Sequence, residues 1–120
     1  MLEKMLWIGR LFDYYGGLLT PRQQNCVRMH YLEDLSLGEI ADEFGVSRQA
    51  VHDILNRAVQ TLEAYEKKLG LVARRKREQE LLRQILAALD SLPAACSQQP
   101  RLLAAQAAIR SLLAEERMAE

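Results

Sequence analysis

Five polar side chains occupy the outward face of one predicted helix, within its first three turns. Arginine pairs well with guanine and with phosphate, whereas glutamine and asparagine pair well with adenine. On a helix that enters a major groove, such side chains reach base edges and the sugar-phosphate backbone. The pattern therefore predicts a nucleic-acid contact formed by Arg48, Gln49, His52, Asn56 and Arg57.

A second candidate is a run of four consecutive basic residues, Arg74, Arg75, Lys76 and Arg77. It is the most concentrated positive charge in the chain. One interpretation is a solvated helix face, partly neutralised by the glutamates that follow it. The other is a contact with the phosphates of RNA or DNA.

Two predicted helices position the first set of residues. Ser36 and Glu39 form a capping box that starts one helix, Gly45 allows a left-handed turn at its end, and Ser47 caps the next helix. Val46 fills the corner between them. Apolar residues recur at helical spacing on the inner faces, at Leu37, Ile40, Ala41 and Phe44 and at Val51, Ile54, Leu55 and Ala58. This arrangement predicts a helix-turn-helix.

A helix-turn-helix can bind nucleic acid or can be a plain helical hairpin, because the fold alone does not fix function. Residues 1–70 carry eight basic and ten acidic side chains, and residues 71–120 carry eight and six. Proteins that bind DNA strongly are usually basic. The acidic balance of the first part, including Asp53 on the outward face, therefore argues against strong non-specific DNA binding.

The remaining sequence also favours helix, so we expect an all-α protein. A first helix is predicted over residues 2–15, ending at Gly16, and a second starts at a Thr20 capping box and closes near Asp34. The helix that Ser47 caps is predicted to continue to Gly70. We therefore expect a helix-turn-helix domain of about four helices at 1–70 and a C-terminal helical extension at 71–120.

The predicted extension carries two apolar stripes, separated by a proline-bounded loop at residues 93–100. The first stripe comprises Leu81, Leu82, Ile85, Leu86, Leu89 and Leu92, and the second comprises Leu102, Ala105, Ile109 and Leu112. The second stripe either covers the first or pairs with another copy of the chain. We favour a homodimer, because symmetric pairing is the commonest way to bury such a surface.

Several other classes of protein are disfavoured. Cys26 and Cys96 have no partner spacing, which indicates the reduced thiols of a cytoplasmic protein. His30 and His52 are isolated, so no metal or other cofactor is expected. The chain has no nucleophile paired with a base and no glycine-rich phosphate loop, so we expect no enzyme. No apolar run approaches the roughly 20 residues of a membrane span, so direct membrane insertion is not expected.

Residues 19–65 resemble the promoter-reading C-terminal region of bacterial sigma factors. The shared segments are Leu-Thr-Pro-Arg-Gln at 19–23, Tyr-Leu-Glu-Asp-Leu-Ser at 31–36 and Gly-Val-Ser at 45–47. This resemblance implies a sigma-region-like or winged-helix-like core and a DNA-binding transcriptional regulator. A dimer of that kind would place two recognition helices in successive major grooves, about 34 Å apart.

The whole chain resembles the YlxM family of small bacterial helix-turn-helix proteins. The resemblance is carried by Leu-Phe-Asp-Tyr-Tyr-Gly at 11–16, Thr-Pro-Arg-Gln at 20–23, Val-Ser-Arg-Gln-Ala-Val-His-Asp at 46–53 and Leu-Glu-Ala-Tyr-Glu-Lys-Lys-Leu at 62–69. Membership implies a regulatory part in the signal recognition particle pathway. The partners it implies are the particle's GTPase, its RNA, or both, with the basic run at 74–77 meeting phosphates.

Overall fold

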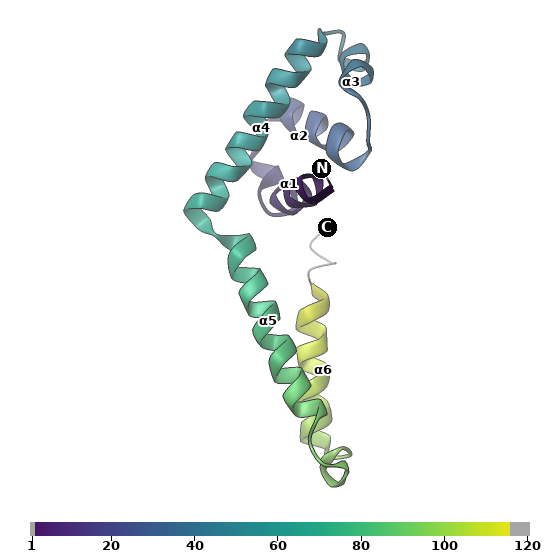
Figure 1. The fold of residues 1–120 in the computed structure, drawn as a ribbon, viewed down its shortest axis with the longest axis vertical. Helices are drawn as coiled ribbons and strands as arrows, with labels where there is room; N and C mark the ends of the chain where they lie inside the picture. The colour runs from purple at the N-terminus through teal and green to yellow at the C-terminus, as the bar shows by residue number, and fades with distance from the viewer. Residues whose placement is uncertain (1, 116–120) are drawn as a thin grey trace. The chain divides into compact units, whose positions relative to one another are not determined.

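The computed structural model describes residues 2–115, and all the regular structure in that range is helical, which confirms the all-α prediction (Figure 1). Because no strand occurs within those residues, no β wing accompanies the helix-turn-helix there. The chain divides into two compact units, residues 1–72 and 73–120. The main helices of the first unit are α1 (Leu2–Tyr15), α2 (Pro21–Val27), α3 (Leu37–Phe44) and α4 (Arg48–Leu69).

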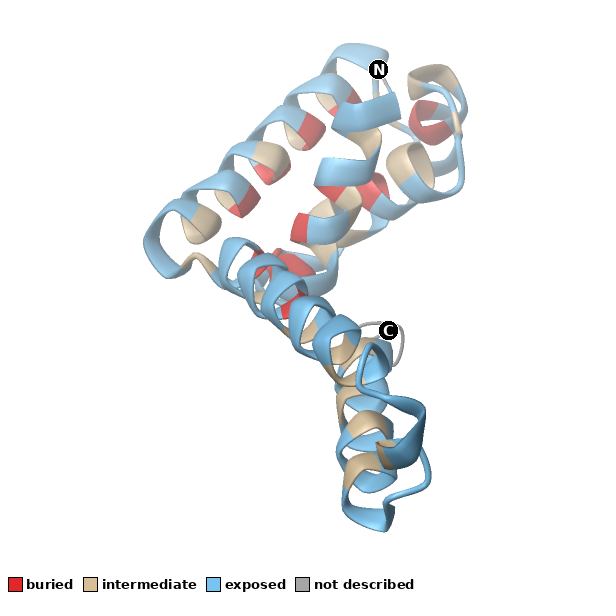
Figure 2. Ribbon diagram, turned by 60° about the horizontal axis from the view of Figure 1, so that its bottom comes forward, coloured by how far each residue is buried: buried red, intermediate tan, exposed pale blue. Residues whose placement is uncertain are grey.

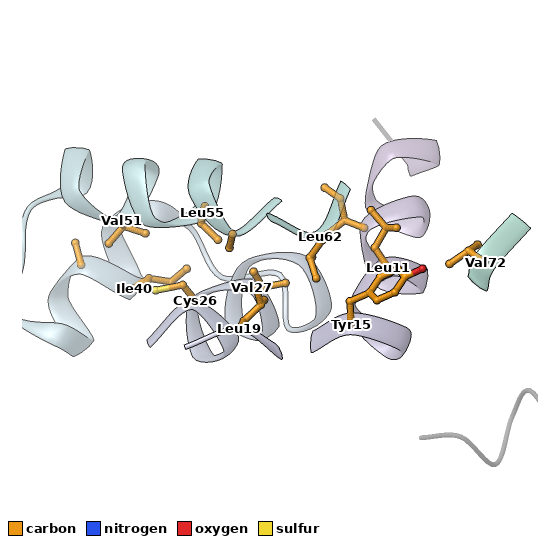
Figure 3. Close-up of a cluster of buried hydrophobic side chains, with 13 residues drawn as sticks. Leu11, Tyr15, Leu19, Cys26, Val27, Ile40, Val51, Leu55, Leu62 and Val72 are labelled. Atoms are coloured by element: carbon orange, nitrogen blue, oxygen red, sulfur yellow. The ribbon is translucent and has the colours of Figure 1, made fainter. Parts of the chain in front are cut away.

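Helix α4 organises the first unit, because α1, α2 and α3 all pack against it. Its buried residues are Val51, Leu55, Ala58 and Leu62, which recur every three or four positions and so form one stripe. Figure 2 shows these buried positions on the side of α4 that faces the other helices of this unit. Figure 3 shows the stripe meeting side chains from α1, α2 and α3, including Leu11, Val27 and Ile40. Ile54 is only partly buried against this core.

Local capping sets the helix ends as the sequence predicts. The Oγ1 of Thr20 accepts a hydrogen bond from the Gln23 N–H at 3.2 Å, and the Oγ of Ser36 accepts one from the Glu39 N–H at 3.1 Å. In both capping boxes, the side chain of Gln23 or Glu39 in turn accepts a hydrogen bond from the backbone N–H of the cap residue. Gly45 then adopts a left-handed conformation with φ 66°, which confirms the predicted turn.

The end of the second helix differs from the prediction. Helix α2 stops at Val27 and is followed by a single wider π-helical turn, η2 (Arg28–Leu32). The chain then leaves through Asp34, which has a positive φ of 59°, and the Leu35 N–H donates to the Met29 carbonyl at 2.8 Å. Nδ1 of His30 lies 2.8 Å from the Leu35 carbonyl oxygen. His30 therefore helps to close this turn.

A hydrogen-bond network holds the junction after α4. The Tyr15 hydroxyl donates to Oε1 of Glu66 at 2.6 Å and accepts from the Leu71 N–H at 3.1 Å. The same Glu66 oxygen accepts from the Val72 N–H at 3.1 Å. Gly70, with φ 63°, ends α4 where predicted. The first backbone N–H groups of the next helix, which cannot bond within it, are thus satisfied by side chains of the first unit.

The second unit is a hairpin of two helices, α5 (Leu71–Asp90) and α6 (Pro100–Ala114), joined by a loop that contains η3 (Ala94–Cys96). The start of α5, Leu71 and Val72, belongs to the first unit. The two helices run antiparallel and side by side (Figures 1 and 2). An oxygen of Asp90 accepts hydrogen bonds from Gln106 at 2.8 Å and from Arg110 at 3.3 Å. No helix within residues 2–115 has the length and apolarity that a bilayer-spanning segment requires.

The contact stripe of α6 differs from the predicted one. Its partly buried residues are Leu102, Gln106, Ile109 and Leu113. Ala105 and Leu112, which the sequence assigns to this stripe, are exposed. The reason is that α6 meets a single neighbouring helix in this hairpin, so only a narrow strip of its surface is covered. The predicted heptad pattern counted residues on both sides of that strip.

Candidate nucleic-acid interface

The predicted binding residues of α4 are all exposed and lie outside the buried stripe. Exposed positions include Arg48, Gln49, His52, Asn56 and Arg57. The two arginines are nine positions apart, which at about 100° per residue places them on opposite sides of the helix. Arg48 is seven positions before buried Leu55 and therefore lies next to the buried stripe, at one edge of the exposed face. The amides and the imidazole lie between them. The face therefore presents two cations at its edges, with neutral hydrogen-bonding groups and the Asp53 carboxylate between them.

Arg48 also lies against the other helix of the motif. A methyl group built on Gly38 in the first turn of α3 would be 3.1 Å from Nε of Arg48 and 3.2 Å from its Nη2. A larger residue at position 38 would therefore push the guanidinium aside. The sequence analysis did not single out Gly38, although a glycine inside a helix, where it is unfavourable, was the available signal.

The middle of the face is tied together by side-chain contacts one turn apart. The amide Nε2 of Gln49 donates to Oδ1 of Asp53 at 3.0 Å, and Nδ1 of His52 lies 3.8 Å from the same oxygen. The amide nitrogen of Asn56 lies 3.4 Å from Nδ1 of His52. These contacts are exposed to water, and a ligand that uses the Gln49 amide must first break its bond to Asp53. The Asp53 carboxylate opposes phosphate and occupies the Gln49 amide that would bind a base.

The basic run does not form one surface. Successive helical residues rotate by about 100°, so four in a row surround α5. Arg74 pairs with Glu78 at 3.0 Å, while Nη2 of Arg75 donates to the Leu112 carbonyl at 2.6 Å. That carbonyl belongs to the last turn of α6 and also accepts a hydrogen bond from the Glu115 N–H. Arg75 therefore joins the two helices of the hairpin. The other members of the run, Arg74, Lys76 and Arg77, are exposed.

The other polar groups of interest have structural surroundings. Cys26 is fully buried, and burial raises the pKa of its thiol. Burial likewise raises the pKa of Tyr31. Within the part of the chain that the structure describes, no group of three His, Cys, Asp or Glu side chains is placed to hold a metal ion. The outward face of α4 is thus the candidate site that both the sequence and the fold single out.

Comparison with known proteins identifies relatives of this chain. A family described as "Putative helix-turn-helix protein, YlxM / p13 like" matches residues 2–99. A UPF0122 protein of Desulforamulus reducens is 57% identical over 83 residues, which are 69% of this chain and 71% of the relative. One from Symbiobacterium thermophilum is 54% identical over 83 residues, covering 69% and 78%. One from Halalkalibacterium halodurans is 49% identical over 90 residues, covering 75% and 83%.

The family match includes all of α1 to α5, and α6 lies beyond its last residue. It therefore contains the capping boxes, the Gly45 turn and the whole outward face of α4. The extent of this match and the identity of the relatives agree with the resemblance drawn from the sequence motifs. The chain belongs to the UPF0122 family of YlxM-like helix-turn-helix proteins.

Proposed function

We propose that this chain is a cytoplasmic, non-enzymatic regulatory protein that binds nucleic acid through the outward face of α4. The observation that carries the proposal is the exposure of this face, with Arg48 lying across Gly38 at one edge and Arg57 at the other. Two cations flanking a set of hydrogen-bonding side chains, Asp53 among them, suit a ligand whose phosphates border a readable groove or loop. The functional context we propose is the signal recognition particle pathway, as the YlxM resemblance implies.

Within that pathway, the proposed ligand is the RNA of the particle, and its GTPase is the proposed protein partner. RNA is favoured over DNA because Asp53 lies in the middle of the face and holds the Gln49 amide. Sequence reading in a DNA major groove needs such amides free to bind base edges. Folded RNA is recognised more by shape and phosphate contacts, which the flanking arginines can provide.

A DNA-binding transcriptional regulator is the second candidate. Arg48 and Gln49 favour it, because they occupy the start of α4, where recognition helices contact base edges. In this case, DNA binding would break the Gln49–Asp53 hydrogen bond. Selection from a pool of random duplexes would enrich a defined sequence if this candidate is correct.

Equilibrium binding of the purified chain tests both candidates. The ligands are the particle RNA, the particle GTPase and a random duplex DNA, each at low and at near-physiological salt. Arg48→Ala and Arg57→Ala should each weaken RNA binding by roughly 5- to 20-fold and reduce its salt dependence by about one phosphate contact. Arg101→Ala, an exposed arginine of the second unit, is the matched control and should leave RNA binding unchanged.

Each outcome separates the candidates. If neither RNA nor GTPase binds at low salt, the proposed pathway is wrong. If RNA binds but both arginine variants bind as the wild type does, the α4 face is not the interface. Asp53→Asn should strengthen RNA binding, since it removes a negative charge from the centre of the face.

A further inference from the structure

An exposed apolar stripe runs along α5 on a side that α6 does not cover. Its members are spaced four, three and four residues apart. The first three align along one side of α5, and the fourth lies in the turn two residues after the helix ends at Asp90, where its N–H donates to the Leu89 carbonyl at 3.3 Å. They are Leu81, Ile85, Ala88 and Leu92, all of them exposed. By contrast, Leu82, Leu86 and Leu89 are partly buried in the hairpin. The apolar surface of α5 is thus wider than a single neighbouring helix can bury.

The other helix of the hairpin extends this surface. Arg110 bonds to Asp90, and Leu103, seven residues before Arg110, lies on the same side of α6. That side also carries Asp90 and is polar. Ala105 and Leu112, also seven residues apart, lie on the opposite side of the α6 contact stripe, beside the exposed stripe of α5. Arg101, four residues before Ala105, lies on this same side at the loop end of α6. One face of the hairpin is therefore largely apolar, with Arg101 at its loop end, and the other carries Asp90 and Arg110.

The second unit also lacks a core of its own. Among residues 73–115, the only residue counted as buried is Gln79, and every apolar side chain retains appreciable exposure. Two helices on their own cannot bury enough apolar surface to be stable, whereas four packed helices can. The apolar face is the surface on which two further helices would complete such a bundle.

The stripe is complementary to itself. Its four-three-four spacing reads the same in both directions. When two copies of α5 pair antiparallel, Leu81 faces Leu92 of the second copy, and Ile85 faces the small Ala88. This reciprocal matching is what a two-fold interface requires, since each contact occurs twice. A large side chain opposite a small one also lets helices interdigitate closely.

The charges around the stripe permit this pairing. The residues beside its middle are uncharged, namely Gln84, Ala87 and Ser91 on α5 and Ala105 and Ala108 on α6. The nearest charges in line with the stripe are Arg74, Arg77 and Glu78, all three or more residues before Leu81. Arg74 and Glu78 neutralise each other at 3.0 Å, so Arg77 leaves one positive charge at this end of the stripe. Antiparallel pairing would therefore bury no like charges against each other at the centre.

We propose that two copies of this chain associate through the apolar faces of their α5–α6 hairpins, with the two α5 helices antiparallel and a four-helix bundle as the result. This names the surface and orientation of a homodimer. It does not rest on nucleic-acid binding, so an absence of RNA binding would leave it intact. The dimer would present two α4 faces to a ligand.

Sedimentation velocity of the full chain over a range of concentrations tests the proposal. The wild type should sediment as a dimer at micromolar concentrations. Ile85→Glu should weaken dimerisation by roughly 100-fold or more, because two charges enter the centre of the interface. Leu103→Glu is the matched control, since Leu103 is 45% exposed and Ile85 48% exposed. It should leave the dimer intact, because Leu103 lies on the polar face.

Circular dichroism should show that both variants have the wild-type helix content. The cooperative unfolding transition of the first unit should also be the same in both variants as in the wild type. A wild type that remains monomeric at 200 µM would overturn the proposal, as would an Ile85→Glu chain that dimerises like the wild type. An equal loss of dimerisation in Ile85→Glu and Leu103→Glu would contradict the assignment of the interface to the apolar face.

Cross-linking tests the orientation in a Cys96→Ser background. Antiparallel pairing predicts that a mixture of Ile85→Cys and Ala88→Cys chains forms disulfide-linked dimers faster than either chain alone. Faster linking of each chain with itself would indicate parallel helices and would overturn the antiparallel arrangement. Buried Cys26 is the same in all three samples and cancels in the comparison.

Discussion

In the first unit, three helices cover one side of α4 and enclose a continuous cluster of fully buried side chains, among them Ile8, Val27 and Leu62. In the second unit, two helices of similar length touch along a narrow strip and share polar bonds at Asp90 and Arg75. Both units are rich in leucine. The difference shows that the number of helices meeting at one place, more than apolar composition, determines whether a helical segment has a core of its own.

Truncating a leucine in each unit is the strongest test of this comparison. Leu62→Ala should lower the free energy of unfolding by about 2–5 kcal/mol, because Leu62 is fully buried and the change leaves a cavity. Leu86→Ala, in the hairpin, should cost less than about 2 kcal/mol in monomeric chain, since that side chain is already partly exposed. Urea denaturation at low protein concentration measures both. Equal losses would mean that the hairpin is packed as tightly as the first unit.

Two left-handed glycines compare the turn of the helix-turn-helix with the end of the first unit. Gly45 and Gly70 have nearly the same positive φ, and a methyl group on either would meet no atom within 4 Å. Gly45→Ala should therefore cost about 1–2 kcal/mol through backbone strain alone. Gly70→Ala should cost less, because strain at the edge of the unit can relax. Gly17→Ala, where φ is not positive, is the control and should change the thermal midpoint little.

Helix caps offer a smaller test, in which one substitution should destabilise a helix of the first unit and another should stabilise a helix of the second. Ser36→Ala should destabilise the first unit by about 1 kcal/mol, because the Glu39 N–H loses its acceptor. At the start of α6, Gln99 has an extended cap conformation but makes no side-chain cap bond. Gln99→Asp should therefore stabilise α6 by about 0.5–1 kcal/mol. Slower amide exchange in α6 would verify this, and unchanged exchange would contradict it.

The smallest effect on stability at neutral pH is expected at Tyr15, whose hydroxyl bonds to Glu66 and Leu71 near the end of the first unit. Burial, followed by the hydrogen bond to Glu66, raises the pKa of its hydroxyl. A raised pKa means that stability is fully present below about pH 10 and is lost as the pH rises towards the folded-state pKa. The wild type should therefore lose stability in alkali more steeply than Tyr15→Phe, by at most about 1.4 kcal/mol per pH unit. Parallel curves for the two proteins would exclude this contribution.

Much of the first unit could be predicted because its helix ends depend on neighbouring residues. The capping boxes at Thr20 and Ser36 and the glycine turn at Gly45 each involve residues at most three or four positions apart. The exposure of the α4 face also followed from periodicity, since the buried stripe at Val51 and Leu55 determines which side faces water. The binding role of that face stays a prediction.

Other features depend on contacts that no local pattern contains. The contact of Arg48 with Gly38 requires the crossing of two helices. The bond from Arg75 to the Leu112 carbonyl joins two helices across 37 residues.

The sequence by itself determined the class of the protein, its helix boundaries and the side of α4 that faces water, because short-range hydrogen bonds and helical periodicity govern these properties. Only the tertiary structure decided the Tyr15–Glu66 junction, which joins residues 51 positions apart, and which half of the α5 apolar surface is covered. The physical reason is that covering an apolar surface requires a second element, and its position depends on the path of the whole chain.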